Sequence, residues 1–189
     1  DVILENQSGE GWFSEYGGAD PGYETLGLTY LADAHLRHPE LGLAKALGQS
    51  LQFLQNFAHP DGSFGGGYGS RNTRFLVPGG IEALADGFPA AAALAAFARR
   101  SVGNQRVVTL ASIDEPNLAP HFNAYCWAAT TAAARRAAQT APAMIELPCE
   151  QPERSRLRFP HAGLVIDNTP RPYTVISIAQ GGYVARFHK

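Results

Sequence analysis

The sequence predicts an α+β protein with two parts: a helical part over residues 1–142 and an antiparallel β-sheet part over residues 143–189. In the first part, alanine, leucine and aromatic residues recur at helical spacing. In the second, β-branched residues alternate with proline- and glycine-containing turns, which is typical of short strands. A glycine-rich turn that occurs twice further indicates that the helical part is built from hairpin repeats.

The predicted helices are separated by proline- and glycine-containing turns. Tyr23, Leu26 and Tyr30 share one stripe and predict a helix over residues 22–37, which Asp20-Pro21 begins and His38-Pro39 ends. Leucines at intervals of three or four residues predict a second helix with one buried face. This second helix covers residues 40–58, and further helices are predicted over residues 78–85, 88–100 and 116–140.

The second part contains short segments with strand character, separated by turns such as Gln180-Gly181-Gly182. Strands are predicted over residues 156–159, 164–166, 173–178 and 183–187. So few strands cannot bury both faces of a sheet, and the last one runs almost to Lys189. We therefore expect the remainder of a longer chain, or an oligomeric partner, to complete the β part.

Composition narrows the classes of partner. The formal net charge of −2, without a basic stripe, argues against nucleic acid. No stretch has the length of a membrane span, and no signal peptide is visible, so we expect a soluble protein of unknown compartment. Cys126 and Cys149 are too few for a metal site, and phosphate-loop and dinucleotide motifs are missing, so neither metal nor cofactor is expected. Charged residues are only 17% of the chain, which suggests that another surface covers part of it.

The repeated turn pairs residues 10–17 with residues 61–69. Each copy has an acidic residue followed by glycine, then an aromatic residue, a Tyr-Gly pair and a helix. The copies are about 50 residues apart, which fits one helical hairpin per repeat. Because a single hairpin cannot bury its apolar face, stacked hairpins are expected to bring both turns to one hollow.

This layout resembles the α/α-toroid proteins, in which helical hairpins surround a central cleft. Residues 7–12 are similar to the glutamine–glycine–aromatic turns of the terpene cyclase and prenyltransferase branch, but the clustered aspartates of the cyclases are missing. A toroid followed by antiparallel sheet is closer to bacterial polysaccharide lyases of the heparinase II/III and chondroitinase AC kind, and residues 162–184 resemble the first strands of their β-sandwich. The resemblance implies a multidomain α+β protein: a partial α/α toroid followed by an antiparallel β-sandwich segment.

The densest polar segment, residues 68–74, has the residue types that a uronate lyase needs. Arg71 can pair with the sugar carboxylate, Asn72 can donate a hydrogen bond to it, and Tyr68 can exchange a proton. His121 is the candidate general base. In the lyases that the chain resembles, tyrosine, histidine, asparagine and arginine fill these roles. The predicted catalytic residues are therefore Tyr68, Arg71, Asn72 and His121.

The first repeat supplies the candidate substrate-binding residues, because aromatic rings can stack on the apolar faces of sugars. The predicted set is Trp12, Glu15, Tyr16, Asp20 and Tyr23, with Asn123 beside His121. A structural role is the alternative for several of these residues. Asp20 can simply cap the following helix, and a lone histidine is more often structural.

Together these features predict a polysaccharide-degrading or -modifying enzyme, a lyase acting by β-elimination on uronate-containing glycans. One alternative is an inverting glycoside hydrolase, which needs two carboxylates facing each other across a cleft. Its candidates are Glu15, Asp20, Glu24 and Glu82. Another alternative is a non-catalytic module that binds glycan or protein.

Overall fold

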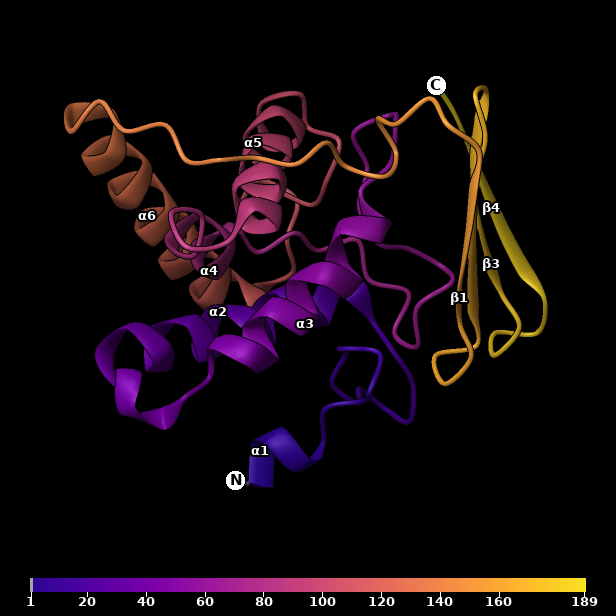
Figure 1. Ribbon diagram of the computed structural model, residues 1–189, viewed down its shortest axis with the longest axis horizontal. Helices are drawn as coiled ribbons and strands as arrows, with labels where there is room; N and C mark the ends of the chain where they lie inside the picture. The colour runs from indigo at the N-terminus through magenta and orange to yellow at the C-terminus, as the bar shows by residue number, and fades with distance from the viewer. Residues whose placement is uncertain (1) are drawn as a thin grey trace.

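A computed structural model describes residues 2–189, with the helices on one side and the sheet on the other (Figure 1). The helices are α1 (Val2–Glu5), α2 (Pro21–Arg37), α3 (Ala44–Leu54), α4 (Pro78–Ala83), α5 (Pro89–Gly103) and α6 (Glu115–Ala137), with short 3-10 turns at Pro39–Leu41 and Gln55–Phe57. The strands are β1 (Ser155–Phe159), β2 (Leu164–Asn168), β3 (Pro172–Ser177) and β4 (Tyr183–His188).

Most helices begin and end close to the predicted positions. Asp20 caps α2 by accepting a hydrogen bond from the Tyr23 backbone N–H, and a proline occupies the first turn. The predicted helix over residues 40–58 is instead divided into a 3-10 turn, α3 and a second 3-10 turn. The division falls at Gly42, whose φ of 66° lies in the left-handed region, which an α-helix cannot include.

Helix α4 lies at the centre of the helical part and packs against α2, α5 and α6, while α3 packs against α2. Two threonine hydroxyls join α2 to the start of α4. The Oγ1 atom of Thr25 accepts the Val77 N–H at 3.0 Å, and that of Thr29 accepts the Gly80 N–H at 3.2 Å. These buried contacts supply partners for backbone donors of the α4 first turn, which has no side-chain cap.

The four strands form one antiparallel sheet in the order β1-β2-β3-β4. Alternate residues of β2 and β3 are buried and face the helical part. The Phe159 ring meets the Phe53 ring edge-on with centroids 5.0 Å apart, and the Tyr173 hydroxyl donates to the Asn56 carbonyl at 2.7 Å. The inner face of the sheet is thus covered by the end of α3 and the 3-10 turn after it.

This architecture corrects the predicted fold class. Residues 2–189 form six α-helices and a single four-stranded antiparallel sheet, and the expected α/α toroid followed by a β-sandwich is wrong. Helices α2, α5 and α6 pack around α4 instead of forming a ring of hairpins. A second sheet is not needed over the inner face of the first, because helical residues already bury it.

The predicted boundary near residue 142 lies in the irregular segment between α6 and β1, which crosses the molecule past α5 (Figure 1). One apolar core nevertheless extends across it. Buried residues of both parts, such as Leu47 and Phe57 on one side and Ile166 and Val175 on the other, belong to the same cluster.

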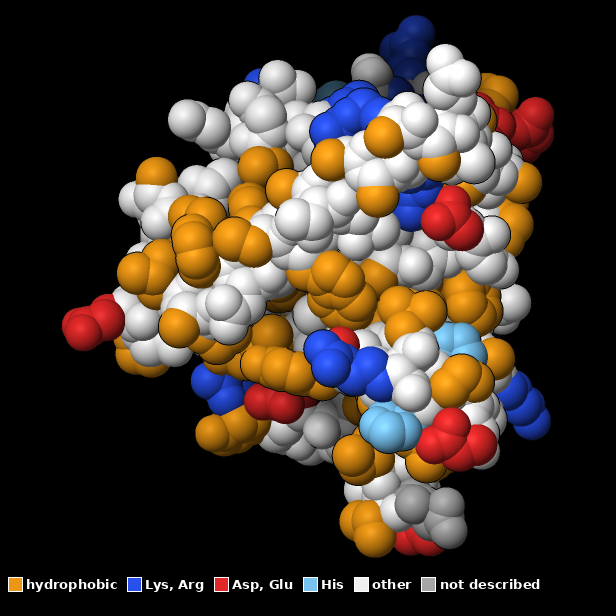
Figure 2. Space-filling model, turned by 90° about the vertical axis from the view of Figure 1, so that its left-hand side faces the viewer, with side chains coloured by type: hydrophobic (Ala, Val, Ile, Leu, Met, Phe, Trp, Pro, Cys, Tyr) orange, Lys and Arg blue, Asp and Glu red, His pale blue; other side chains and the backbone are white. Residues whose placement is uncertain are grey.

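Much of the outer surface is apolar, as the low charged fraction suggests. Apolar side chains are spread over the side of the molecule that carries α6 (Figure 2), and the exposed ones include Leu118 and Phe122. Within residues 2–189, no helix combines the length and apolar character needed to cross a bilayer.

Candidate functional site

The two glycine-rich turns, each taken with the residues that follow it (18–20 and 70–74), lie against each other, and Asp20 joins them. Asp20 is buried, and its carboxylate accepts the Tyr23 N–H at 3.0 Å and the Arg71 N–H at 2.9 Å. It also accepts hydrogen bonds from the Thr73 N–H and the Thr73 hydroxyl. One carboxylate therefore caps α2 and organises the second turn at the same time, which commits Asp20 to structure rather than to catalysis.

Further contacts bring the turns into close approach. The Ser70 N–H donates to the Ala19 carbonyl at 3.0 Å, and the Ser70 hydroxyl donates to the Glu15 carbonyl at 2.6 Å. At Gly69, a Cβ atom would stand 2.8 Å from the Asp20 carboxylate, so only glycine fits there. The two related turns therefore lie together, as the repeat predicted. They do not share one hollow, however, because residues 13–15 line one pocket and residues 65–68 line another.

Arg71 is held between the first turn and the start of α2. Its guanidinium carbon lies 4.1 Å from the Tyr16 ring centroid and 5.0 Å from that of Tyr23, and its Nη1 atom is 3.5 Å from the Glu15 carboxylate. The predicted residues Glu15, Tyr16, Tyr23 and Arg71 thus form one partly exposed group. Because both rings and the carboxylate engage the guanidinium, Arg71 serves first as a link between the turns.

Tyr68 lies apart from this group, beside a cleft of about 310 Å³ between the second turn and β4. One wall of the cleft is formed by the backbone of Gly65, Gly66 and Gly67. Arg74 also lines the cleft. Strand β4 contributes its Tyr183 and Arg186 side chains. Among residues 2–189, neither Arg74 nor Arg186 has a carboxylate partner, so both guanidinium groups are available to an anion.

The Tyr68 hydroxyl begins a chain of hydrogen bonds with a defined direction. The Ser63 hydroxyl donates to the Asp61 carboxylate at 2.7 Å, so its oxygen accepts from the His59 Nδ1 atom at 2.9 Å. The His59 proton is therefore assigned to Nδ1, which leaves Nε2 as an acceptor. The Tyr68 hydroxyl, 2.8 Å from Nε2, is then the donor.

Burial keeps both rings of this pair uncharged. It lowers the pKa of His59 to about 3, against a smaller opposing effect of Asp61. It also raises the pKa of Tyr68 above its usual range. The His59 ring is further held by stacking on Phe187, with centroids 3.7 Å apart. The resting pair is a neutral phenol that donates to a neutral imidazole.

The His59 environment predicts a loss of stability in acid. Its pKa is lower in the folded state than the ordinary 6.5, so protonation favours the unfolded chain as pH falls from 6.5 toward 3. The cost reaches about 4 kcal/mol at pH 3. Urea unfolding between pH 4.5 and 3 should show the decline in the wild type, and His59→Gln should remove it there. An equal slope in both proteins would show that His59 does not titrate as expected.

Sequence reasoning did not select His59, Ser63, Arg74 or Arg186. The signal for the first two was the spacing of histidine, aspartate and serine in residues 59–63, directly before the glycine-rich run. No local signal marks Arg186, because it is distant in sequence and reaches the cleft only through the position of β4. The site is therefore a product of tertiary packing between the two parts of the chain.

The other predicted residues lie elsewhere. His121 is buried against Phe75 with ring centroids 4.9 Å apart, and its Nδ1 atom is 2.9 Å from the Asn117 carbonyl. Asn123 is exposed in a groove between α2 and α6. Neither His121 nor Asn123 lines the Tyr68 cleft.

Two more predicted residues also contribute little to the cleft. Asn72 is exposed in the second turn with a φ of 56°, and its N–H donates to the Gly69 carbonyl. Trp12 is buried, and its Nε1–H donates to Glu10 at 2.9 Å, so its ring is not free to stack on a sugar. Glu10 also accepts the His161 N–H, which ties the first turn to the β1–β2 connection.

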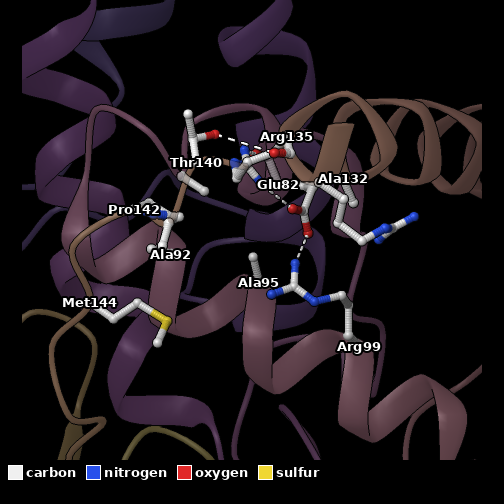
Figure 3. A pocket seen from close by; sticks show the side chains of 12 residues that line it. Glu82, Ala92, Ala95, Arg99, Ala132, Arg135, Thr140, Pro142 and Met144 are labelled. Atoms are coloured by element: carbon white, nitrogen blue, oxygen red, sulfur yellow. Dashed lines mark hydrogen bonds and ion pairs between the residues drawn. The ribbon is translucent and has the colours of Figure 1, made fainter. Parts of the chain in front are cut away.

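The carboxylates considered for hydrolysis are engaged within the protein. Glu82 is buried beside a pocket under the segment that follows α6, and it is held by Arg99 at 2.5 Å and by Arg135 (Figure 3). Glu24 is buried and accepts the Phe13 N–H at 2.9 Å. With Asp20 also committed, only Glu15 of the four candidates is partly exposed.

Within the described residues 2–189, no group of three or more His, Cys, Asp or Glu side chains converges as a metal site would require. Comparisons of the chain with protein families, with characterised proteins and with solved structures gave no match. The function is therefore inferred from the chemistry of the site.

Proposed function

We propose that this protein is part of a lyase that cleaves uronate-containing polysaccharides by β-elimination at the Tyr68 cleft. The observation that supports the proposal best is the Tyr68–His59 hydrogen bond of 2.8 Å beside a cleft lined by two uncommitted arginines. Elimination needs a cation for the sugar carboxylate and a group that takes one proton and returns one. The cleft supplies the cations, and the Tyr68–His59 pair, whose tyrosine is only 2% exposed at the cleft wall, supplies the proton carrier.

In the proposed reaction, Arg74 and Arg186 bind the uronate carboxylate and stabilise the negative charge that develops at the adjacent carbon. The Tyr68 oxygen removes the proton from that carbon while its own proton passes to His59 Nε2. The electrons of the broken carbon–hydrogen bond form the new double bond, and the bond to the leaving oxygen breaks. The proton then returns from His59 through Tyr68 to the leaving oxygen. Ser63 and Asp61 hold the His59 tautomer.

This assignment changes the roles first predicted within the second turn. Tyr68 keeps its role in proton transfer, while the recognition of carboxylate moves from Arg71 to Arg74 and Arg186. The group of Tyr16, Tyr23 and Arg71 is left to position the turn. Tyr16 is 81% exposed, so it also offers a ring on which a sugar can stack.

Tyr68→Phe tests the proposal, because it removes only the hydroxyl. With uronate polysaccharides as substrates, the wild type should produce the ultraviolet absorbance of an unsaturated sugar. Tyr68→Phe should lower the rate about 100-fold or more. Tyr30→Phe, at an exposed position of α2, is the matched control and should keep full activity.

Three outcomes would contradict the proposal. Equal rates for Tyr68→Phe and wild type would exclude Tyr68 as the group that moves the proton. New reducing ends without absorbance would indicate hydrolysis. Binding of the polysaccharide with no cleavage would indicate a non-catalytic module.

A further inference from the structure

A second pocket, of about 260 Å³, lies at the end of α5, beside the loop that carries His59 and Asp61. Ser101 lines it and is only 1% exposed, yet its hydroxyl has no hydrogen-bond partner. A buried hydroxyl without a partner is costly, and such groups usually bind water, an ion or a ligand. The Ser101 hydroxyl is therefore the feature of this pocket that points to a ligand.

The acidic groups around the pocket are already engaged. Asp61 accepts hydrogen bonds from the Ser63 N–H at 3.0 Å and the Ser63 hydroxyl at 2.7 Å. Glu150 pairs with Arg100 at 2.7 Å and also accepts the Leu147 N–H at 3.2 Å. Neither carboxylate is left without a donor.

The carbonyl groups at the end of α5 are engaged as well. The carbonyls of Arg100, Ser101 and Val102 accept backbone N–H groups of the residues that follow the helix, Asn104, Arg106 and Gln105. The negative end of the helix is thus partly neutralised where it meets the pocket.

The polar groups left over are donors. Within residues 2–189, the Arg106 guanidinium has no carboxylate partner, and it lines the pocket together with Asn104 and Ser101. The Arg106 side chain also packs over Gly62, where an added Cβ atom would lie 3.0 Å from its Cγ. A guanidinium, an amide and a hydroxyl around one hollow are suited to the oxygens of an anion.

We propose that this pocket binds a tetrahedral oxyanion, a sulfate or phosphate group, through Ser101, Asn104 and Arg106. The group has two possible sources, a free inorganic anion or an ester on a larger ligand such as a sulfated glycan. The pocket shares Asp61 with the Tyr68 cleft, so an ester on a bound glycan would join the two sites. The oxyanion site itself does not depend on the proposed lyase activity.

Ser101→Ala gives a clean test, because removing a hydroxyl that has no partner should not weaken the fold. Isothermal titration with sodium sulfate and with sodium phosphate, at ionic strength held constant with chloride, should show saturable binding to the wild type. Ser101→Ala should weaken binding about fivefold, and Arg106→Gln about tenfold or more. Arg158→Gln removes an equal charge from an exposed position of β1 and should leave the affinity unchanged.

Competition identifies the source of the anion. A sulfated oligosaccharide that displaces inorganic sulfate, when its unsulfated counterpart does not, indicates an ester; no displacement indicates a free anion. Absence of saturable binding, or equal affinity in the wild type and Ser101→Ala, would overturn the proposal. So would an equal loss in Arg158→Gln and Arg106→Gln, since it would indicate attraction to charge in general.

Discussion

Glu24→Gln is expected to raise the free energy of unfolding by about 3 kcal/mol at pH 8 and to leave it nearly unchanged at pH 4. Burial raises the pKa of Glu24 from 4.5 to about 7, although the Phe13 N–H, which donates to the carboxyl group, opposes this shift. The folded protein therefore carries a proton at this carboxyl that the unfolded chain releases near pH 4.5.

The hydrogen bonds around Ser50 explain why the protonated form fits. The Ser50 hydroxyl oxygen lies 2.7 Å from Glu24 Oε1 and 2.9 Å from the Gly11 carbonyl, and it is 3.3 Å from Gln7 Nε2. A serine hydroxyl has one hydrogen. All three contacts are satisfied when Glu24 donates to Ser50 and Ser50 donates to Gly11. A glutamine side chain at position 24 can donate the same bond at every pH.

The sign of the effect follows from proton binding. Because the pKa is higher in the folded state, stability falls as pH rises from 4.5 to about 7 and is constant above that range. His59 acts in the opposite direction below pH 6.5, so the two groups partly offset each other in the wild type. The single variants Glu24→Gln and His59→Gln separate them.

Denaturant unfolding at several pH values measures the difference. Glu153→Gln, at an exposed position, is the control and should follow the wild-type curve at each pH. If Glu24→Gln kept the wild-type dependence between pH 4.5 and 7, the carboxyl would have to be ionised in the folded protein.

Asp20→Ala is expected to destabilise the protein by about 3–5 kcal/mol, a large fraction of the stability of a typical domain. The substitution removes the cap of α2 and leaves the N–H groups of Arg71 and Thr73 without their acceptor. Because these contacts join the two turns, the loss should also loosen the second turn, where Tyr68 begins the hydrogen-bond chain. Thermal and denaturant unfolding measure the first effect.

Asp33→Ala is the matched control, since it removes a carboxylate from the same helix. Asp33 makes an exposed pair with Arg37, four residues further along, at 2.7 Å, and losing it should cost about 0.5 kcal/mol or less. Protease cleavage or hydrogen exchange within residues 61–74 should increase in Asp20→Ala alone. Similar stability losses in the two variants would show that Asp20 does not clamp the turns.

The two related turns could be recognised from the sequence because their backbone is set by neighbouring residues. Both copies are closed by an equivalent antiparallel bridge, Gln7 with Phe13 and Ala58 with Phe64, and the two copies do lie together. The prediction of a toroid was wrong, because helical spacing defines which face of a helix is apolar but not the neighbour that buries it. Phe53 and Phe57 could have faced another helix, but they face the sheet.

By itself, the sequence determined the four strands, most of the helices and the presence of two related turns, because these depend on spacing and turn residues within short segments. Helix α1 and the division of residues 40–58 were not predicted. Only the tertiary structure decided that Asp20 is a clamp, that His121 is buried against Phe75, and that Tyr68 meets His59 next to Arg186 of β4. The chemical role of a side chain depends on its burial and on partners distant in the chain. Those are properties of packing, which no short stretch of sequence contains.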